Sequence, residues 1–204
     1  MKPTYFLFLM VGGIFYFACQ KPPIDYATAL ATCKPDTIRM VIDKDTIVRL
    51  SPGIKCIIGS QLPEFSGLTM DGKKIDHDYL KGKVSVFNFW FIGCMPCEAE
   101  MPGFNRLTEK YKSSPVNFLA ISRNSPKDIK EFLEKNPFTM DHIAYGEPLI
   151  VENFKHIWGY PTTIVADKHM KILFAKHGGR TDSLAISEIQ KELIPIIDEA
   201  LEGS

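Results

Sequence analysis

The sequence predicts an α/β protein in which helices cover a central β-sheet. Apolar, β-branched runs at residues 84–90, 116–122 and 162–167 alternate with segments of helical periodicity, which is typical of a layered α/β domain. With 204 residues, 45% of them hydrophobic and 24% charged, the chain can bury the core of one domain and carry extensions. Lysine plus arginine equals aspartate plus glutamate at 24 each, so no positive excess indicates nucleic-acid binding.

The first residues are typical of an export signal. Lys2 precedes an apolar run over residues 5–18, which is shorter than a bilayer span and has the length of a signal-peptide core. We therefore expect residues 1–18 to be a signal peptide and the protein to act on the periplasmic side of the membrane. Disulfides form and persist in such an oxidising compartment.

The end of this segment resembles a bacterial lipoprotein signal. Ala18 is followed by Cys19, although Tyr16 stands where an aliphatic residue is usual. The resemblance implies that Cys19 is lipidated and holds the protein at the membrane, with ordinary secretion or an uncleaved anchor as the alternatives. Residues 19–35 contain prolines and little periodicity, which predicts a tether.

A β-hairpin is predicted after the tether. Residues 37–50 contain two β-branched runs around a polar turn. Cys33 and Cys56 lie at equal distances from a turn centred between Lys44 and Asp45, which would place them opposite each other in an antiparallel ladder. We expect a structural disulfide between them. The alternative is a pair of small buried residues, because prolines at both strand ends could stop the ladder first.

The remaining elements follow from turn, capping and periodicity signals. They are a tight turn at Asp71 and Gly72, a helical turn at 77–80, helices at 97–112, 128–135, 149–158 and 183–201, an ambiguous segment at 138–145 that can hold a short strand, and a strand at 171–177. In the helix at 149–158 four apolar residues are expected to face inward, namely Val151, Phe154, Ile157 and Trp158. Pro195 is expected to split the last helix, because it removes a backbone hydrogen bond.

The residues after the first buried strand, GCMPC at 93–97, carry the chemistry. Cys94 lies at the start of a helix, and Pro96 suits the first turn because its missing N–H is not needed there. Free N–H groups and the helix dipole favour a thiolate at this place, so Cys94 is the expected nucleophile. Cys97, one helical turn further on, is the expected resolving thiol. Two zinc ligands or an inert pair are the alternatives. The sequence has no second CxxC and its histidines are scattered, so we expect redox chemistry and no metal.

The run FNFWFIGCMPCEAEMP resembles the segment NFWxxWCxPCxxExP of the TlpA/ResA-like branch of thioredoxin-fold proteins, and the likeness extends over residues 58–201. The resemblance implies a thioredoxin-like domain at 58–204, with a central mixed sheet flanked by helices, after a hairpin extension at 36–57. It also implies a thiol:disulfide oxidoreductase, of the protein-disulfide reductase type, whose redox-active disulfide is its only redox group, without a further cofactor. One departure is Gly93, which stands where relatives often carry a tryptophan, while Trp90 matches the earlier tryptophan. The absence of this ring beside the nucleophile affects the expectation of how partners dock, but not the expectation of which chemistry occurs.

The resemblance further assigns residues around the thiols. Tyr160 and Pro161 stand where thioredoxin-fold proteins carry a cis-proline, so their loop would face the nucleophile and pair with a substrate peptide. The bare sequence gives only a proline at a strand start, for which a trans bond is the alternative. The expected substrate-binding set is completed by Trp90, which we also expect to be core beneath the site, and by Met95 and Pro96.

Glu100 is the third expected catalytic residue. It lies three residues after Cys97 and so on the same helical face. In ResA-like relatives a glutamate at this place is associated with tuning thiol acidity and with proton transfer. The alternative is a solvated carboxylate that the helix dipole favours in a first turn.

The expected partners are disulfide-bearing exported proteins and a membrane thiol electron donor, with no nucleic acid. A thiol peroxidase is one rival, but its nucleophile usually follows a threonine by three positions, where this chain has Phe91. A copper chaperone of the Sco type would need a wider CxxxC and a distal histidine. A lipoprotein whose domain supports only protein contact is the last rival.

Overall fold

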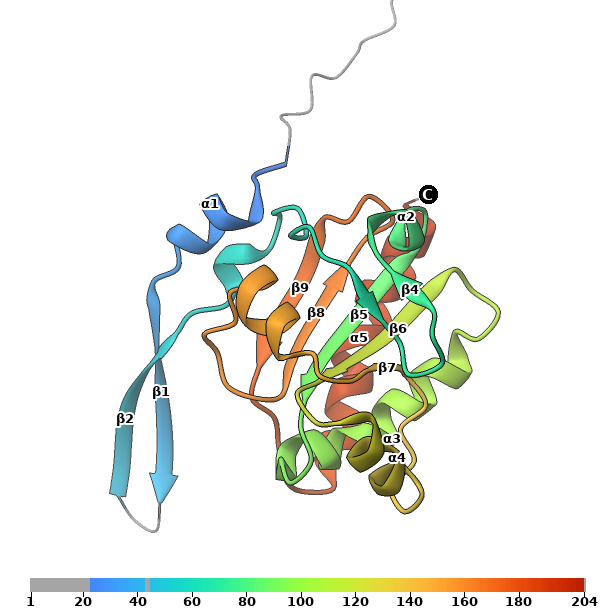
Figure 1. The fold of residues 1–204 in the computed structure, drawn as a ribbon. Helices are drawn as coiled ribbons and strands as arrows, with labels where there is room; N and C mark the ends of the chain where they lie inside the picture. The colour runs from blue at the N-terminus through green and yellow to red at the C-terminus, as the bar shows by residue number, and fades with distance from the viewer. Residues whose placement is uncertain (1–22, 43–44, 204) are drawn as a thin grey trace, which may run out of the picture.

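A five-stranded mixed sheet forms the centre of the protein, in the order β7-β6-β5-β8-β9 (Figure 1). The computed structural model describes residues 23–42 and 45–203, so the expected signal peptide at 1–18 and Cys19 lie outside the described residues. The strands are β5 (Val84–Trp90), β6 (Val116–Ser122), β7 (Asp141–Ile143), β8 (Thr162–Ala166) and β9 (Ile172–His177). Strands β5, β6 and β7 are parallel, whereas β8 pairs antiparallel with both β5 and β9.

Strand β5 is buried on both faces and divides the core into two layers. Phe87 and Phe89 belong to one layer, and Val86 and Trp90 to the other, because successive side chains of a strand point to opposite faces. The near-continuous apolar sequence of β5 is what a parallel strand covered on both faces requires.

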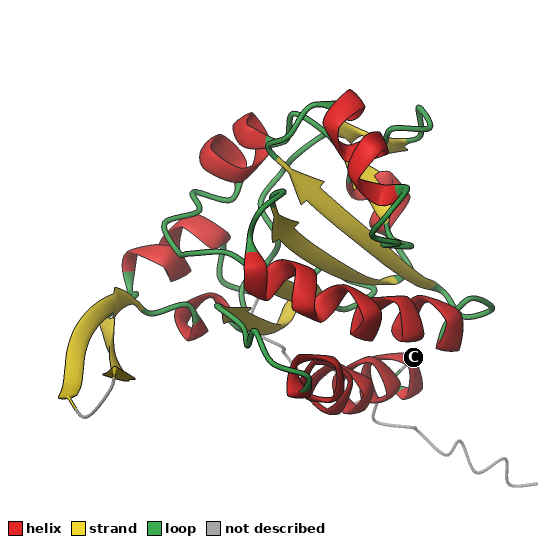
Figure 2. Cartoon of the chain, turned by 90° about the horizontal axis from the view of Figure 1, so that it is seen from below, coloured by secondary structure: helices red, strands yellow, loops and turns green. Residues whose placement is uncertain are grey.

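Two long helices, α3 (Met95–Lys110) and α5 (Leu184–Glu202), pack side by side on one face of the sheet (Figure 2). Helix α4 (Pro126–Leu133) lies in the same layer and is capped by Ser125, as predicted. The expected split of α5 at Pro195 is wrong, because the helix continues through it. Ile189, Leu193 and Ile197 are buried on both sides of the proline, and this packing holds the helix together.

The other face is covered by short elements (Figure 1). They are α1 (Tyr26–Ala31), the 3-10 helix η1 (Lys55–Ile57), β3 (Gly67–Leu68), β4 (Lys74–Ile75), α2 (His77–Leu80) and the π-helical turn η2 (Leu149–Asn153). The predicted turn between β3 and β4 is present, with Gly72 in the left-handed region at φ +85°. Among the described residues, no helix has the length and hydrophobicity that crossing a bilayer requires.

The helix expected at 149–158 is a single turn. Lys155 has a φ of +47°, which ends helical geometry, so the apolar positions on either side of it do not share one face. Phe154 and Trp158 are buried as predicted, but Val151 and Ile157 are 49% and 57% exposed, so their inward placement is wrong.

The expected tether at 19–35 is wrong where the structure describes it, because α1 packs against the domain. Asp25 caps the helix by accepting from the N–H of Thr28 at 2.9 Å. The buried Tyr26 donates its hydroxyl to the carbonyl oxygen of Phe154 at 2.7 Å. A capping aspartate before a short helix was the sequence signal.

The predicted hairpin is formed by β1 (Pro35–Ile42) and β2 (Asp45–Pro52), which project from the body as a two-stranded ribbon (Figure 1). The predicted turn centre is one residue too late, because Pro35 pairs with Pro52 and Ile42 with Asp45. The ladder ends at its prolines, and Cys56 lies beyond it in η1. A disulfide nevertheless joins Cys33 and Cys56, whose Cα atoms are 5.1 Å apart.

Candidate active site

The end of β5 and the start of α3 place the CxxC segment. Cys94 is the N-cap residue of α3, and Pro96 occupies the first turn, as the sequence predicted. Gly93 has a φ of +88°, a conformation that suits glycine, so a tryptophan at this place would need a different backbone. The Gly93 N–H donates to Glu98 Oε1 at 2.9 Å, which ties the turn to the helix. Glu98 therefore has a bonding partner in this turn.

Cys94 and Cys97 form a disulfide, with Cα atoms 5.2 Å apart. Both cysteines are buried, and they differ in their place on the helix, because Cys94 is the N-cap residue and Cys97 lies inside the first turn of α3. After reduction, the N–H groups and the dipole of a 16-residue helix favour a thiolate at Cys94. The pair thus has the arrangement of a nucleophile with a resolving thiol beneath it.

Glu100 is buried beside this pair. Its side chain is on the inner face of α3, the residue is 4% exposed, and its Oε2 forms no hydrogen bond to any residue in the described ranges. Burial raises the pKa of Glu100 to about 8, Lys176 opposes the rise, and Glu192 and Glu188 add to it. The carboxyl group can therefore hold or release a proton near neutral pH. Its expected catalytic role stays a prediction.

The charge nearest to Glu100 is itself neutralised. Lys176 on β9 donates to Glu188 Oε1 at 2.7 Å and to Glu192 Oε2 at 2.8 Å. Burial opposes the charge on Lys176, but its bonds to Glu188 and Glu192 outweigh burial and hold the pKa of Lys176 above its usual range. Because two carboxylates share one ammonium group, little of its positive charge is left to ionise Glu100.

The loop before β8 completes the site. The Tyr160–Pro161 peptide bond is cis, which confirms the predicted geometry. The Pro161 ring and the Glu100 carboxyl group both lie against Gly179. A Cβ built on Gly179 would lie 3.0 Å from Glu100 Cδ and 3.3 Å from Pro161 Cγ. Sequence reasoning missed Gly179, although the Gly-Gly pair after β9 was a signal for close backbone approach.

A half-buried histidine, His156, holds the same loop. The Thr162 hydroxyl donates to the Gly159 carbonyl at 2.7 Å, so its only proton is used there. His156 Nε2, 3.0 Å from that hydroxyl oxygen, must therefore be the donor. Burial first, and His177 second, lower the pKa of His156 to about 4, so the ring is neutral near pH 7.

The expected substrate-binding residues divide into surface and core. Met95 is 72% exposed, and Pro96 and Tyr160 are half-buried at the same end of the sheet. Trp90 is fully buried against Phe132, Phe138 and His142, so substrate contact is wrong for it and only the expected core role remains.

Sequence reasoning also missed a contact next to the thiols. The Tyr160 ring meets the Phe91 ring edge-on at 5.2 Å, and the Arg123 guanidinium carbon lies 4.1 Å from the centre of the Phe91 ring. Phe91 and Arg123 directly follow β5 and β6, and the last residues of these parallel strands pair in register. That pairing was the signal, since the carboxyl ends of parallel strands meet at one edge of the sheet.

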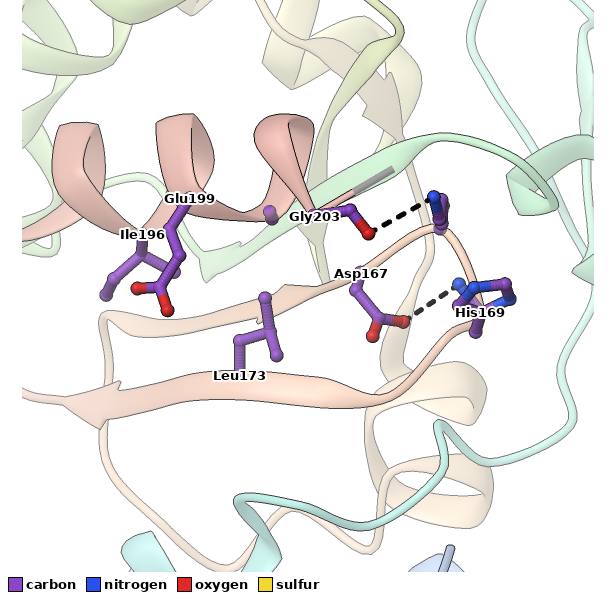
Figure 3. A pocket seen from close by; sticks show the side chains of 8 residues that line it. Asp167, His169, Leu173, Ile196, Glu199 and Gly203 are labelled. Atoms are coloured by element: carbon purple, nitrogen blue, oxygen red, sulfur yellow. Dashed lines mark hydrogen bonds between the residues drawn. The ribbon is translucent and has the colours of Figure 1, made fainter. Parts of the chain in front are cut away.

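No three His, Cys, Asp or Glu side chains within residues 23–42 and 45–203 lie close enough to hold a metal ion together. A cavity of about 410 Å³ lies at the opposite end of the sheet from the thiols, between the β8–β9 turn and the end of α5 (Figure 3). The side chains of Asp167 and Lys168 in its lining bond within the protein. Asp167 Oδ1 accepts from the N–H of His169 at 2.8 Å, and Lys168 Nζ donates to the Gly203 carbonyl at 3.4 Å.

Comparison with known proteins gives a family match and relatives that are named thiol-disulfide oxidoreductases. Residues 58–175 match the AhpC/TSA family. The chain is 30% identical over 138 residues to the thiol-disulfide oxidoreductase ResA of Bacillus cereus, which covers 67% of this chain and 79% of the relative. It is 32% identical over 146 residues to ResA of Bacillus thuringiensis subsp. konkukian, covering 69% and 81%.

Solved structures share the fold. A thiol:disulfide interchange protein of the thioredoxin family from Chlorobium tepidum superposes with a TM-score of 0.57 at 24% identity, over 69% of this chain and 95% of that one. The thioredoxin domain of a thiol-disulfide oxidoreductase from Bacteroides vulgatus gives a TM-score of 0.58 at 21% identity, over 69% and 97%. These likenesses confirm the predicted thioredoxin-like fold.

Proposed function

Because this chain belongs to the AhpC/TSA family and is a thiol-disulfide oxidoreductase, we propose that it reduces disulfides of exported proteins on the periplasmic side of the membrane. The observation that carries the proposal is the Cys94–Cys97 disulfide at the N-terminus of α3, with Glu100 and the Pro161 loop beside it. A redox pair, a buried proton carrier and a peptide-facing loop are the parts that such a reaction needs.

In the proposed reaction the Cys94 thiolate attacks one sulfur of a substrate disulfide. A mixed disulfide forms, and the other substrate sulfur leaves as a thiolate. The Cys97 thiolate then attacks Cys94 Sγ, which releases the second substrate thiolate and forms the enzyme disulfide seen in this structure. Two electrons have passed to the substrate, and a membrane dithiol donor returns two electrons and two protons to the enzyme.

Glu100 is proposed to move the proton of Cys97. A thiol attacks only after it loses its proton, and a buried carboxyl group with a pKa of about 8 can accept one near neutral pH. In the re-reduction step the same group returns the proton.

The setting of the enzyme is part of the proposal. Residues 1–18 would direct export, and lipidation of Cys19 would hold the mature chain at the membrane. The disulfide between Cys33 and Cys56 supports this setting, because such bonds persist in oxidising compartments. Labelling with radioactive palmitate, compared between the native chain and Cys19→Ser, tests the anchor; label retained in the variant would exclude lipidation there.

A thiol peroxidase is the competing activity within the same fold. Three positions before Cys94, where the peroxidase carries a threonine, this chain has the Phe91 ring under the Arg123 guanidinium. No hydroxyl group is present there to bind a peroxide oxygen. This observation favours disulfide exchange.

The decisive experiment traps the mixed disulfide. Cys97→Ser expressed in the native host should accumulate covalent adducts on Cys94 that a reductant releases, and Cys94→Ser should accumulate none. Mass spectrometry of the adducts names the substrates. An absence of adducts, in cells where another exported oxidoreductase is trapped, would contradict the proposal. Alkylation of the native chain in cells gives the direction, since a chain found only as the disulfide would exclude a reductase.

A further inference from the structure

Resting on the proposed function, we propose that Phe91, Arg123 and Tyr160 form a docking surface that favours partner polypeptides with a carboxylate a few residues from the target cysteine. We call these three residues the cationic ring stack. It specifies the substrate class that the thiols alone leave open.

The stack is assembled from three separate segments. Phe91 directly follows β5, Arg123 directly follows β6, and Tyr160 comes two residues before β8. The Arg123 guanidinium carbon lies 4.1 Å from the centre of the Phe91 ring and 5.9 Å from the centre of the Tyr160 ring. The two rings meet edge-on, with centres 5.2 Å apart and planes at 89°. A cation over two ring faces is held by their negative quadrupoles.

The stack adjoins Cys94 through Phe91 and the Glu100 carboxyl group through the Tyr160 loop. The Cys94 N–H donates to the Phe91 carbonyl at 3.2 Å, so the nucleophile and the first ring share one turn. Tyr160 is bonded to Pro161, whose ring lies near Glu100. Gly93 lies between Phe91 and Cys94 in the sequence and carries no side chain. The Phe91 ring, with the Tyr160 ring packed against it, therefore supplies the aromatic surface at this turn.

The N–H donors of the Arg123 guanidinium group are available to a ligand. Arg123 is exposed, and within the described part of the chain no residue forms a hydrogen bond or an ion pair with it. Its five N–H donors lie in the plane of the group, and stacking covers a face and leaves the edges to solvent. This is the geometry that receives a carboxylate through two parallel hydrogen bonds.

Charged residues near Tyr160 affect which partner the surface favours. Burial raises the pKa of Tyr160, Glu147 raises it further and Arg123 lowers it, so both a negative and a positive group act on the Tyr160 hydroxyl. The carboxylate of Glu98 accepts a hydrogen bond from the Gly93 N–H and forms no ion pair with Arg123. An extended partner chain advances about 3.3 Å per residue, so a side chain two to four residues from the attacked sulfur can reach a surface next to Cys94.

The test compares peptides that differ in one charge. Reduced enzyme is given disulfide-bonded peptides that are identical except for Glu, Gln or Lys at the second, third or fourth residue from the cysteine. We expect kcat/KM to be about tenfold higher for the Glu than for the Lys peptide at one of these positions, as one charge-assisted hydrogen bond allows. The preference should fall as salt rises, because the contact is exposed.

Variants assign the preference to the stack. In Arg123→Gln the ratio of the Glu to the Lys rate should fall to about one, and in Glu147→Gln it should rise. Arg106→Gln is the matched control, since Arg106 is an exposed arginine on α3 whose guanidinium faces Gln190 on α5, and its ratio should equal that of the native chain. An unchanged ratio in Arg123→Gln would overturn the inference. A misfolded variant would lower both rates without moving the ratio towards one, and circular dichroism identifies it.

Failure of the inference is distinct from failure of the proposed function. Hydroxyethyl disulfide is small and uncharged, so its reduction reports only the two thiols. If the native chain reduces it and also reduces all three peptides equally, the docking surface is wrong and the oxidoreductase stands. If the native chain reduces neither hydroxyethyl disulfide nor any peptide, the proposed function itself is wrong.

Discussion

The carboxyl group of Glu100 lies directly against the backbone of Gly179, with no room between them for a methyl group. A Cβ at position 179 would overlap Glu100 Oε1, and it would come within 3.0 Å of Glu100 Cδ and 3.3 Å of Pro161 Cγ. The proposed proton carrier and the loop proposed to hold the substrate thus both approach one glycine. A side chain at this place would force the Glu100 carboxyl group to move.

We predict that Gly179→Ala lowers kcat for disulfide reduction by about tenfold. The new methyl group would overlap Glu100 Oε1, so the carboxyl group must move aside, and displacement of a reacting group has a large effect on rate. Gly203→Ala is the control, because a Cβ there meets only the Glu199 carbonyl at 3.4 Å, an ordinary contact. Equal turnover in the two variants would show that the close approach has no part in the reaction.

Glu100→Gln should make stability less dependent on pH. The unfolded carboxyl group loses its proton near pH 4.5, whereas the folded one holds it to about 8. Between these values the folded state binds more protons, so Glu100 lowers stability as pH rises, by at most about 1.4 kcal/mol per pH unit. The glutamine variant should therefore gain on the native chain from pH 5 to 8 in urea unfolding. A constant difference across this range would show that Glu100 is ionised in the fold.

The same substitution separates a catalytic from a structural role. If Glu100 accepts the Cys97 proton, the pH profile of kcat should lose a step near 8 in Glu100→Gln, and single-turnover release of product from the mixed disulfide should slow. A profile that keeps its shape would assign the step to another group.

Local signals were sufficient for the reactive segment. The strand Val84–Trp90 and the N-cap position of Cys94 follow from an apolar run and a proline in a first turn, and neither depends on distant residues. The cis bond at Pro161 followed from the resemblance alone. Long-range packing explains the errors. Tyr26 is held by the Phe154 carbonyl, 128 residues away in sequence, so a segment with little periodicity folds as a helix against the domain.

The candidate site shows the same limit. The residues on each side of the thiols were predictable one segment at a time, but the contact of Arg123 with Phe91 depends on the register between β5 and β6. Gly179 meets Glu100 only because β9 returns along β8. Trp90 was assigned to substrate binding as well as to the core. It is the last residue of its strand, and the sequence does not show whether the side chain there points into the core or towards the site.

We predict that His156 makes the fold sensitive to acid. Its pKa is about 4 in the fold and 6.5 when unfolded, so its contribution to stability is present above pH 6.5 and is lost as pH falls towards 4. His156→Gln keeps a donor for the Thr162 hydroxyl and does not titrate. It should lose on the order of 1–2 kcal/mol less than the native chain between pH 7 and 4.5 in urea unfolding. Parallel curves would show that the ring is charged in the fold. The buried His142, whose pKa burial also lowers, should leave some acid sensitivity in both proteins.

Removal of the disulfide between Cys33 and Cys56 should cost stability and leave the reactive thiols intact. The bond closes a loop between residues 23 apart in sequence, which in the chain-entropy view is worth about 3 kcal/mol. Both residues are half-buried and pack on the core layer that holds Trp158, whose Nε1 donates to the Gly53 carbonyl at 2.9 Å. The double variant Cys33→Ser, Cys56→Ser should therefore unfold at lower urea and keep its rate on hydroxyethyl disulfide. A peptide map without reductant in which both cysteines are alkylated would show that the bond is absent from the native chain.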